Sequence, residues 1–325
     1  MKIHLSAICG TAMASLAGLL RERGHVVTGS DQDVYPPMST QLEALGIPIL
    51  SPYAESNVPA DADVVVIGNA LSRGNPEVEA VLDRRQPFTS LPALLADEFL
   101  RPCRPFVVAG THGKTTTSSL LAFLLQRAGL DPSFLIGGVP VDFERSYRLG
   151  SGPHFVVEGD EYDCAFFDKR PKFVHYLPAL AVIGNVEFDH ADIYSDLAAV
   201  QLAFVRLMQV VPRNGLLVVG GESPALQEIL GHARSRVVSC GLQAGADWRA
   251  VDLRAGPEGM AFRLLREGRD EGEFSLSLAG EHNVRNALAA LAAASEAGVT
   301  LDVARAALPA FRGVKRRLEL RGEAA

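Results

Sequence analysis

The spacing of hydrophobic residues divides the first hundred residues into short apolar runs and longer amphipathic stretches. Apolar runs at 3–8, 25–29 and 64–67 end in Gly, Ser, Asn or Asp, which is typical of buried strands. Residues 13–23 carry apolar side chains at helical spacing, and Pro76 stands where a first helical turn accepts proline. The alternation of strands and helices predicts a parallel sheet with helices on its faces.

The same alternation resumes after a proline-rich stretch at 101–105, which we interpret as a linker because proline disfavours helix and sheet. Residues 236–279 contain short alternating segments and are expected to form a small antiparallel sheet. The fold class is therefore α/β, with two domains that meet at residues 104 and 105. Further strands are expected at 106–109, 155–157, 180–183 and 216–219, and helices at 115–128, 196–210 and 283–297.

Composition narrows the classes of function. The chain has 325 residues, 48% of them hydrophobic, and a formal net charge of −7. Nucleic acids and anionic membrane surfaces select basic proteins, so neither is an expected partner. No run approaches the roughly 20 apolar residues of a spanning helix, and the N-terminus reads as a strand rather than a signal peptide. Four dispersed cysteines, without a CxxC pair, fit a reducing compartment, and we expect a soluble, cytoplasmic protein.

A phosphate-binding loop is the strongest chemical motif. The strand at 106–109 leads into Gly110-Thr-His-Gly-Lys-Thr-Thr and then an apolar helix. Gly110 and Gly113 permit a tight turn whose amides can face phosphate oxygens, and the helix N-terminus adds partial positive charge. Lys114 can bridge the outer phosphates of a triphosphate, and Thr115 can ligate Mg²⁺. The alternative is a glycine-rich turn that ends in Lys-Thr without binding phosphate.

Acidic residues follow two later strands, at the edge of a parallel sheet where ligands bind. Glu158 is the preferred Mg²⁺ ligand, and Asp160 and Glu161 are weaker candidates. After the next strand come Asp189 and His190, and His190 is a candidate metal ligand or γ-phosphate contact. The alternatives are a solvated acidic turn and a structural histidine.

Two further motifs leave their roles open. The loop at 7–13 resembles a dinucleotide fingerprint, but Ala and Cys replace its first two glycines, so a nucleoside diphosphate is favoured over NAD. Asp31 stands where a ribose-binding acid belongs, and Arg73 is either a diphosphate ligand or a surface arginine. Asn283 and Asn286 could recognise adenine, but their spacing alone favours a helix cap by Asn283.

Taken together, these motifs resemble the Mur ligase family over residues 1–325. The resemblance rests on the phosphate loop, Glu158 with its acidic neighbours, the segment from Asn185 to His190, Gly280-x-His282-Asn283-x-x-Asn286, and Arg316-Arg317. It implies a Rossmann-like domain at 1–104 that binds UDP-N-acetylmuramate and a P-loop ATPase-like central domain at 105–312 that binds ATP and Mg²⁺.

The resemblance also assigns residues. Sugar-nucleotide contacts would come from Gly10, Thr11, Asp31, Asn69 and Arg73. ATP contacts would come from Gly110, Thr111, His112, Gly113, Lys114, Thr115, Thr116, Asn283, Asn286 and Arg317. The catalytic residues would be Lys114, Glu158 and His190, and the metal ligands Thr115, Glu158 and His190. The two asparagines would then approach adenine, against the preference from spacing.

The implied reaction is ligation through an acyl phosphate. Several segments, among them 34–40 and 161–170, are most similar to family members that join UDP-N-acetylmuramate to the recycled murein tripeptide L-alanyl-γ-D-glutamyl-meso-diaminopimelate. Members that add free L-alanine during peptidoglycan synthesis are the alternative. A nucleotide-binding or regulatory module is the non-enzymatic alternative. The sequence leaves the oligomeric state open.

Three features depart from the family pattern. Ala7 replaces an expected glycine. No lysine lies between Asp189 and Arg213 to match the carbamylated lysine of some relatives, and Gln201 is expected near that place. The chain stops at Ala325, where the family's third domain would begin. We therefore expect 313–325 to be a linker, and this chain alone to bind the sugar nucleotide but lack full ligase turnover.

Overall fold

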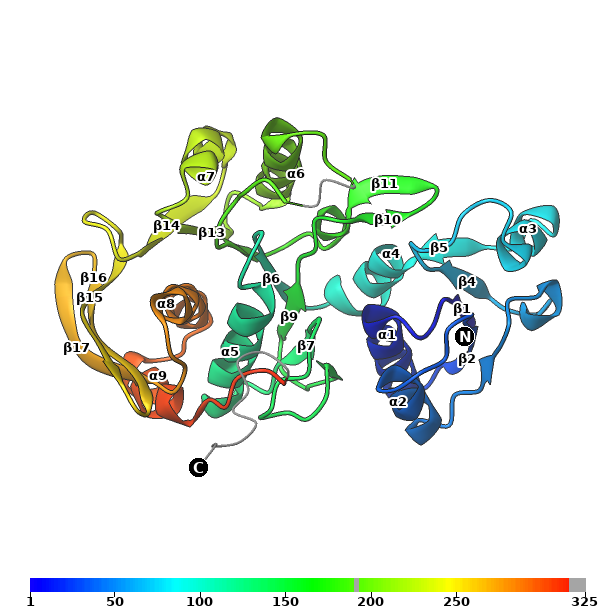
Figure 1. Cartoon of the computed structure of the whole chain (residues 1–325), viewed down its shortest axis with the longest axis horizontal. Coiled ribbons are helices and arrows are strands. Elements are labelled where there is room, and N and C mark those ends of the chain that lie inside the picture. Colours follow the sequence, from blue (N-terminus) through cyan, green and yellow to red (C-terminus); the bar gives the residue numbers. More distant parts are fainter. Residues whose placement is uncertain (190–192, 316–325) are drawn as a thin grey trace, which may run out of the picture. The chain divides into compact units, whose positions relative to one another are not determined.

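The computed structural model describes residues 1–189 and 193–315 and divides the chain into two compact units (Figure 1). Unit 1 contains Met1–Arg101 together with two later segments, Tyr147–Leu149 and Tyr162–Tyr176. Unit 2 contains Pro102–Ser146, Gly150–Glu161 and the chain from Leu177 onward. Segments distant in sequence thus belong to the first unit, and each unit is described separately below.

Unit 1 is built on a parallel sheet, as the alternation of apolar runs predicted. The strand order is β3-β2-β1-β4-β5, and each neighbouring pair is parallel. The strands are β1 (Lys2–Ser6), β2 (Val26–Ser30), β3 (Ile49–Leu50), β4 (Val64–Ile67) and β5 (Phe88–Ser90). The first strand ends earlier than expected, at Ser6, because Ala7 turns the backbone to a φ of +70°.

Helices of unit 1 connect these strands. They are α1 (Thr11–Glu22), α2 (Met38–Ala44), α3 (Pro76–Asp83), α4 (Leu91–Leu95), the 3₁₀ turn η1 (Glu55–Asn57) and the π-helical turn η2 (Ala96–Leu100). The predicted face of α1 is buried, including Met13, Leu16 and Leu20. Pro76 occupies the first turn of α3, and the Asn75 side chain caps that helix by accepting from the Glu77 and Val78 N–H groups.

A hairpin from the middle of the sequence belongs to unit 1 and was not predicted. It consists of β10 (Asp163–Ala165) and β11 (Asp168–Pro171), which pair antiparallel, followed by the 3₁₀ turn η3 (Lys172–His175). At its tip, the Phe167 ring packs edge-on against Phe88, with ring centroids 4.9 Å apart. Phe166 packs against the apolar cluster that contains Val65 and Val78. This aromatic packing attaches the hairpin to the first unit.

Unit 2 is built on a larger sheet with the strand order β17-β16-β15-β14-β13-β12-β6-β9-β7. In this order, neighbouring strands from β7 to β15 are parallel. Strand β16 runs antiparallel to both β15 and β17. The strands are β6 (Arg104–Ala109), β7 (Ser133–Leu135), β9 (His154–Glu158), β12 (Leu180–Ile183), β13 (Leu216–Gly220), β14 (Arg236–Gly241), β15 (Trp248–Gly256), β16 (Gly259–Arg266) and β17 (Arg269–Leu276). The short strand β8 (Tyr147–Arg148) falls in unit 1.

Two expectations about this region need correction. The antiparallel strands within 236–279 extend the main sheet through β14 and β15 instead of forming a small sheet of their own. The expected linker at 101–105 overlaps β6, since Arg104 and Pro105 pair with β9. Pro105 fits this strand because its carbonyl accepts from the Ala179 N–H at 2.9 Å, while the N–H that proline lacks is not needed.

Helices pack on this sheet around one large apolar core. They are α5 (Lys114–Arg127), α6 (Leu197–Val210), α7 (Pro224–Ile229), α8 (Glu281–Glu296) and α9 (Leu301–Ala307), with the 3₁₀ turns η4 (Leu230–His232) and η5 (Leu308–Ala310). Helices α5 and α8 lie side by side (Figure 1). Strand residues such as Phe106 and Val218 and helix residues such as Leu124 and Leu288 are fully buried in this core, so the first turns of both helices are firmly placed.

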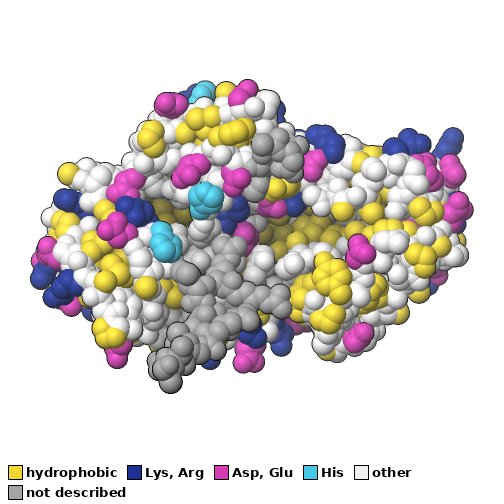
Figure 2. All heavy atoms as spheres, viewed as in Figure 1, with side chains coloured by type: hydrophobic (Ala, Val, Ile, Leu, Met, Phe, Trp, Pro, Cys, Tyr) yellow, Lys and Arg dark blue, Asp and Glu magenta, His cyan; other side chains and the backbone are white. Residues whose placement is uncertain are grey.

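Surface charge agrees with the composition. On the face shown in Figure 2, acidic and basic side chains of the described residues are interspersed and form no extended basic area. Within the described part of the chain, no helix has the length and apolar character needed to cross a membrane.

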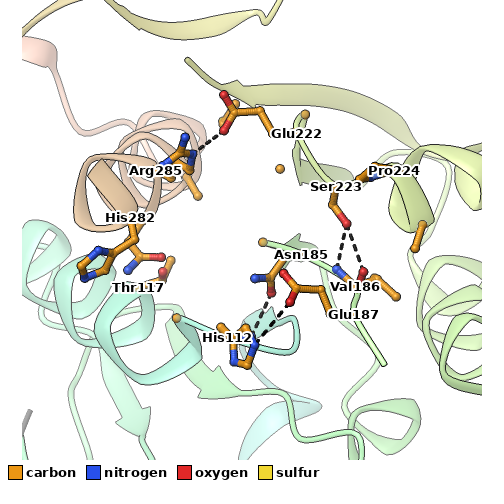
Figure 3. A pocket seen from close by; sticks show the side chains of 18 of the residues that line it. His112, Thr117, Asn185, Val186, Glu187, Glu222, Ser223, Pro224, His282 and Arg285 are labelled. Carbon is orange, nitrogen blue, oxygen red and sulfur yellow. Dashed lines mark hydrogen bonds and ion pairs between the residues drawn. The ribbon is translucent and has the colours of Figure 1, made fainter. Parts of the chain in front are cut away.

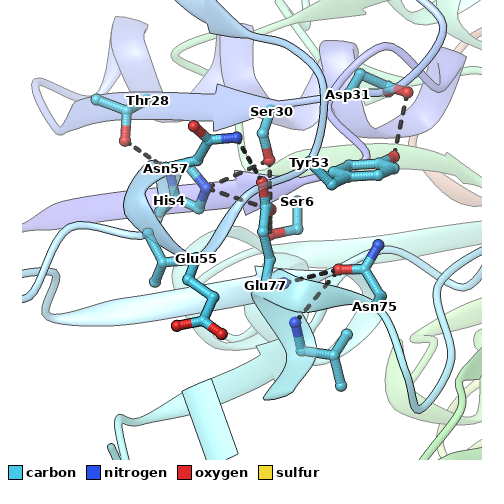
Figure 4. Close-up of polar contacts among 12 residues, drawn as sticks. His4, Ser6, Thr28, Ser30, Asp31, Tyr53, Glu55, Asn57, Asn75 and Glu77 are labelled. Atoms are coloured by element: carbon cyan, nitrogen blue, oxygen red, sulfur yellow. Dashed lines mark hydrogen bonds and ion pairs between the residues drawn. The ribbon is translucent and has the colours of Figure 1, made fainter. Parts of the chain in front are cut away.

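A buried carboxylate on α3 links two strands and the 3₁₀ turn η1 of unit 1 (Figure 4). Glu77, on α3, has a fully buried side chain. It accepts hydrogen bonds from the Ser6 hydroxyl at 2.6 Å, from the Asn57 amide at 2.9 Å and from the Ser30 hydroxyl, and the buried His4 ring lies 3.8 Å away. Ser6 and Ser30 are the last residues of β1 and β2, so Glu77 ties together the two strand ends that precede the loops at residues 7 and 31.

Hydrogen bonding decides the ionisation of this group. Burial by itself would raise the pKa of Glu77, but the hydrogen bonds from His4, Ser30, Ser6 and Asn57 outweigh burial and hold the pKa below its ordinary value of 4.5. The carboxylate is therefore more favourable in the folded protein than in the unfolded chain, and it stabilises the fold wherever it is ionised.

We predict that Glu77→Ala destabilises unit 1 by about 3 kcal/mol at neutral pH, because four polar groups lose their shared acceptor in a buried site. Urea unfolding and hydrogen exchange of the β1 and β2 amides would measure the loss. Glu79→Ala, on the same helix, is the control, because Glu79 contacts the exposed Arg73 and should matter much less. Equal losses in the two variants would contradict a special role for Glu77.

The pH dependence of this effect has a definite sign. A carboxyl group with a lowered folded-state pKa contributes stability above its unfolded pKa, and this contribution disappears as the pH falls through the folded value. The stability difference between wild type and Glu77→Ala should therefore shrink as the pH is lowered below the ordinary value of 4.5. A difference that grows on acidification would refute the network described here.

Candidate functional site

The predicted phosphate loop lies between β6 and α5. Gly110 and Gly113 have φ values of +130° and +79°, which other residues rarely adopt. Space is also limiting, because a Cβ on Gly113 would lie 2.4 Å from Asn286 Oδ1, and one on Gly110 would lie 3.0 Å from the Gly184 nitrogen. Both glycines are therefore required by backbone conformation and by close packing.

The segment after β12 holds this loop in place. The Thr111 N–H donates to the Asn185 carbonyl at 3.1 Å, and the His112 N–H donates to Asn185 Oδ1 at 2.9 Å. In return, the Glu187 N–H donates to the Thr111 hydroxyl oxygen at 3.0 Å. Asn185 was part of the motif quoted from the sequence, and its position shows that it shapes the phosphate loop.

Lys114 points into the loop and is balanced by a buried acid. Its ammonium donates to the carbonyls of Gly110 and Thr111 at 2.7 and 3.2 Å. It also contacts both carboxylate oxygens of Glu161 at 3.1 and 2.9 Å, and the Glu161 side chain is only 2% exposed. Glu161 thus neutralises the charge of Lys114 in this structure. The sequence had suggested metal binding as its role.

Thr115 and Glu158 form the second polar pair at the loop. The Thr115 hydroxyl donates to Glu158 Oε1 at 3.0 Å, and the Gly137 N–H donates to Oε2 at 2.8 Å. Burial raises the pKa of Glu158, although the hydrogen bonds from Gly137 and Thr115 and the charge of Lys114 act in the opposite direction. A divalent cation bound to this carboxylate would compensate for the free-energy cost of removing its charge from water.

The spacing of this pair suits Mg²⁺. An octahedral Mg²⁺ holds its ligands at about 2.0–2.1 Å, so neighbouring ligand atoms lie about 3 Å apart. The separation of Thr115 Oγ1 and Glu158 Oε1 matches that value. Asp160 and Glu161 follow in the same loop, but Glu161 is engaged by Lys114. Thr115 and Glu158 are therefore a pair of described residues that could hold the metal together.

A cavity of about 720 Å³ opens beside the loop (Figure 3). Its volume lies within the range of about 300–1,000 Å³ that is common for small-molecule sites. The lining residues include parts of the phosphate loop, the segments that follow β12 and β13, helix α7 and the first turns of α8. The polar side chains among them include His112, Asn185, Glu187, Glu222, Ser223, Glu228, His282, Arg285 and Asn286.

The two asparagines of α8 have different positions. Asn286 lines the cavity, while Asn283 is 5% exposed and does not. The Asn283 amide donates to the Ala279 carbonyl at 2.7 Å, and its oxygen accepts from the Asn286 amide at 3.3 Å. The residue before the helix is Gly280, so the interpretation of Asn283 as the helix cap is wrong. Asn283 instead orients Asn286.

Sequence reasoning missed the polar residues that follow β13. Glu222 forms an ion pair with Arg285 of α8 and accepts from the Leu242 N–H at 3.1 Å. The Ser223 hydroxyl accepts from the Val186 N–H at 3.0 Å and donates to the Val186 carbonyl at 3.2 Å, which joins two strand ends (Figure 3). Their place after a predicted strand, in the sequence Gly-Gly-Glu-Ser, was a usable signal.

A second cavity, of about 500 Å³, lies in unit 1. Four of the five predicted sugar-nucleotide residues line it, namely Gly10, Thr11, Asp31 and Asn69. Asp31 braces the loop before α1, since its carboxylate accepts from the Cys9 N–H at 2.7 Å and from the Tyr53 hydroxyl at 3.2 Å. Burial and the Asp31 charge raise the pKa of Tyr53, which keeps its hydroxyl protonated as a donor.

Arg73 is the exception among these five residues. It is not among the residues that line the cavity, and its guanidinium forms a two-point ion pair with Glu79, at 2.9 and 3.0 Å. The Arg73 side chain is 67% exposed. The structure thus places it as the surface arginine that the sequence left as an alternative. Cys164 and Lys172, from the inserted hairpin and η3, line the cavity instead.

The structure does not test the predicted roles of four further residues. His190 and Arg317 lie outside the described residues. Thr116 is in the first turn of α5, immediately after the metal-binding candidate Thr115. Gln201, on α6, donates to the Ala225 carbonyl and to Glu228, both at 2.9 Å. These contacts connect α6 with α7 and do not test whether Gln201 replaces the lysine of relatives.

Comparison with family models covers most of the chain. The model described as the Mur ligase middle domain matches residues 108–294, and the model described as the Mur ligase family, catalytic domain matches residues 2–101. The chain belongs to the Mur ligase family. The Mur ligase middle-domain match includes the phosphate loop, Glu158 and the first turns of α8, so the site built above lies in a domain shared by the family.

The chain is also similar to individual members of the family. The chain is 47% identical to the Escherichia coli UDP-N-acetylmuramate–L-alanyl-γ-D-glutamyl-meso-2,6-diaminoheptandioate ligase, over 100% of the chain and 70% of that protein. Its structure resembles the crystal structure of the UDP-N-acetylmuramate:L-alanyl-γ-D-glutamyl-meso-diaminopimelate ligase from Neisseria meningitides, with a TM-score of 0.91 and 45% sequence identity. The match covers 97% of this chain and 99% of the other. The chain is 38% identical to the Burkholderia cenocepacia UDP-N-acetylmuramate–L-alanine ligase, over 99% and 67%.

We predict that Gly113→Ala weakens the binding of Mg-ATP, because the added methyl group would strain the backbone and collide with Asn286. Calorimetric titration with Mg-ATP measures the effect, and a loss of at least about tenfold is expected. Gly129→Ala is the matched control at the other end of α5, since its φ is +75° but its Cβ would meet nothing within 4 Å. Unchanged ATP affinity in Gly113→Ala would show that the loop does not hold phosphate.

Proposed function

We propose that this chain takes part in the ATP-dependent ligation of UDP-N-acetylmuramate to the murein tripeptide L-alanyl-γ-D-glutamyl-meso-diaminopimelate, in peptidoglycan recycling. The observation that carries the proposal is the pairing of Lys114 with Glu161 and of Thr115 with Glu158 on one phosphate loop beside a nucleotide-sized cavity. The choice of substrate is supported by 47% identity to a ligase named for that reaction.

Each part of the site has a role in ATP binding. The loop amides and Lys114 hold the phosphates, and the cavity that Asn286 lines receives the nucleoside. Thr115 and Glu158 would hold Mg²⁺, with His190 retained as a proposed further ligand. Bound Mg²⁺ neutralises phosphate charge. To bind the outer phosphates, Lys114 exchanges its contacts with the loop carbonyls for phosphate oxygens.

The chemistry has two steps. A muramoyl carboxylate oxygen attacks the γ-phosphorus of ATP, the bond to the β-phosphate oxygen breaks, and ADP leaves. The peptide amine then attacks the acyl carbon, loses a proton, and displaces inorganic phosphate to leave an amide. The Lys114 ammonium and the loop amides stabilise the charge on the transferring phosphoryl group, so catalysis depends mainly on positioning and electrostatics.

The cavity of unit 1 is the proposed site of the UDP part of the substrate. Gly10 and Thr11 place the N-terminus of α1 at the cavity, where backbone N–H groups attract phosphate. Asp31 and Asn69 line the same space. We leave Arg73 out of this set because it is engaged with Glu79.

A second candidate is the addition of free L-alanine to UDP-N-acetylmuramate. It is favoured by 38% identity, over 99% of this chain, to a ligase named for that reaction. The choice between the two is tested with a version that spans the full length of the relatives, of which this chain covers 70%. It is incubated with UDP-N-acetylmuramate, Mg-ATP and either tripeptide or L-alanine, and the ligated product is followed chromatographically. Faster product formation with L-alanine would overturn the tripeptide assignment.

We predict that Glu158→Gln weakens the Mg²⁺-dependent part of ATP binding by at least about tenfold, because an amide cannot supply the charge that a hard cation requires. Calorimetry with ATP in the presence and absence of Mg²⁺ separates the metal contribution. Glu144→Gln is the control, because Glu144 is an exposed acid of the same unit. An unchanged Mg²⁺ effect in Glu158→Gln would remove Glu158 from the metal site.

A further inference from the structure

The cavity of unit 1 has an unusual charge balance for a diphosphate site. Asp31 and Asp33 are acidic residues in its lining. Among the described residues that line it, Lys172 alone carries a side chain that is positive at neutral pH. A sugar nucleotide brings a negatively charged diphosphate into this space, so its charge must be met mainly by Lys172 and by backbone N–H groups.

Lys172 is held in place at the cavity by its neighbours. Its backbone N–H donates to the Tyr162 carbonyl at 3.0 Å, which joins the two ends of the inserted segment. Phe173, the next residue, is fully buried and anchors η3. His175, at the end of η3, contacts Asp168 of β11 at 2.8 Å. Lys172 therefore starts a short turn whose backbone is fixed on both sides.

The side chain of Lys172 combines partial burial with a directed position. The residue is half-buried, and its ammonium lies 5.8 Å from the centre of the Tyr162 ring. A lysine in this setting loses less conformational freedom on binding than one in open solvent. By contrast, Lys169 on β11 is 68% exposed, pairs with Asp163 at 2.6 Å, and does not line the cavity.

The other polar groups of the cavity cannot replace this charge. The Asp31 carboxylate repels phosphate and is already used by the Cys9 N–H and the Tyr53 hydroxyl. The N-terminus of α1 supplies partial positive charge only, without a side-chain cap or a basic residue in its first turn. Arg73, the arginine expected from the sequence to pair with the diphosphate, is engaged with Glu79.

We infer that Lys172 binds the diphosphate of the sugar nucleotide in the cavity of unit 1. The inference rests on the proposed function of that cavity and adds to it the residue that supplies the positive charge. It makes the segment Tyr162–Tyr176 part of the sugar-nucleotide site, although this segment lies within the range matched by the Mur ligase middle domain.

The test is calorimetric titration of wild type, Lys172→Met, Lys172→Arg and Lys169→Met with UDP-N-acetylmuramate, and with UDP and uridine as competitors. Lys172→Met should weaken UDP-N-acetylmuramate and UDP by about 10- to 100-fold, the range expected for one hydrogen bond to a charged group. Uridine and Mg-ATP should bind as in wild type. Lys172→Arg should restore most of the affinity, and Lys169→Met should match wild type.

The outcomes separate this inference from the proposed function. If wild type fails to bind UDP-N-acetylmuramate, the assignment of the cavity falls, and the role of Lys172 falls with it. If wild type binds and Lys172→Met binds equally well, only the role of Lys172 is wrong. A loss confined to UDP-N-acetylmuramate, with UDP unaffected, would assign Lys172 to the muramoyl carboxylate and overturn the diphosphate contact. Equal weakening of uridine would indicate a general structural effect.

Discussion

The parallel pairing of β6 with β9 and β12 is the constraint on which the larger unit's site depends. Because parallel strands end at the same edge of a sheet, the phosphate loop after β6, the acids after β9 and the loop after β12 meet there. The phosphate loop can close at this edge only with left-handed backbone at Gly110 and Gly113, where close contacts leave no room for a side chain. Packing of α5 against α8 then brings Asn286 to the same place.

Two acids set the electrostatics of this loop, the buried Glu161 and the half-buried Glu158, and they have different partners. Glu161 is matched by the Lys114 ammonium, whereas Glu158 receives only a hydroxyl and an amide N–H as close donors. The negative charge of Glu158 is therefore not neutralised by a positive side chain in direct contact, and a divalent cation would fit there. The positive charge of Lys114 is already balanced by Glu161, so a phosphate group would have to compete with the loop carbonyls for its ammonium. This division supports the proposed roles of the two pairs, with Thr115 and Glu158 in metal binding and Lys114 in phosphate binding.

The local sequence predicted an element correctly where the pattern of that element alone determines its structure. Strands at 64–67 and 180–183 have the expected bounds, since a short apolar run between polar turns has few other structures available. Prediction failed where a property depended on distant partners. Arg104 and Pro105 looked like a linker until pairing with β9 made them a strand, and three strands after 236 joined the main sheet because β14 and β15 continue its edge.

The order of residues alone was enough to predict an α/β fold with a phosphate loop, because glycines, lysine and threonine at fixed spacing between a strand and a helix leave little freedom. The ligase activity was implied only by the resemblance to the Mur ligase family. Sequence order could not choose between Arg73 and Lys172 for the cavity of unit 1. Arg73 is close in sequence to the cavity residues but is drawn to Glu79, while Lys172 is about a hundred residues later and is carried there by the packing of Phe166 and Phe167. Such long-range apolar contacts leave no local pattern, so only the folded chain reveals which charge reaches the site.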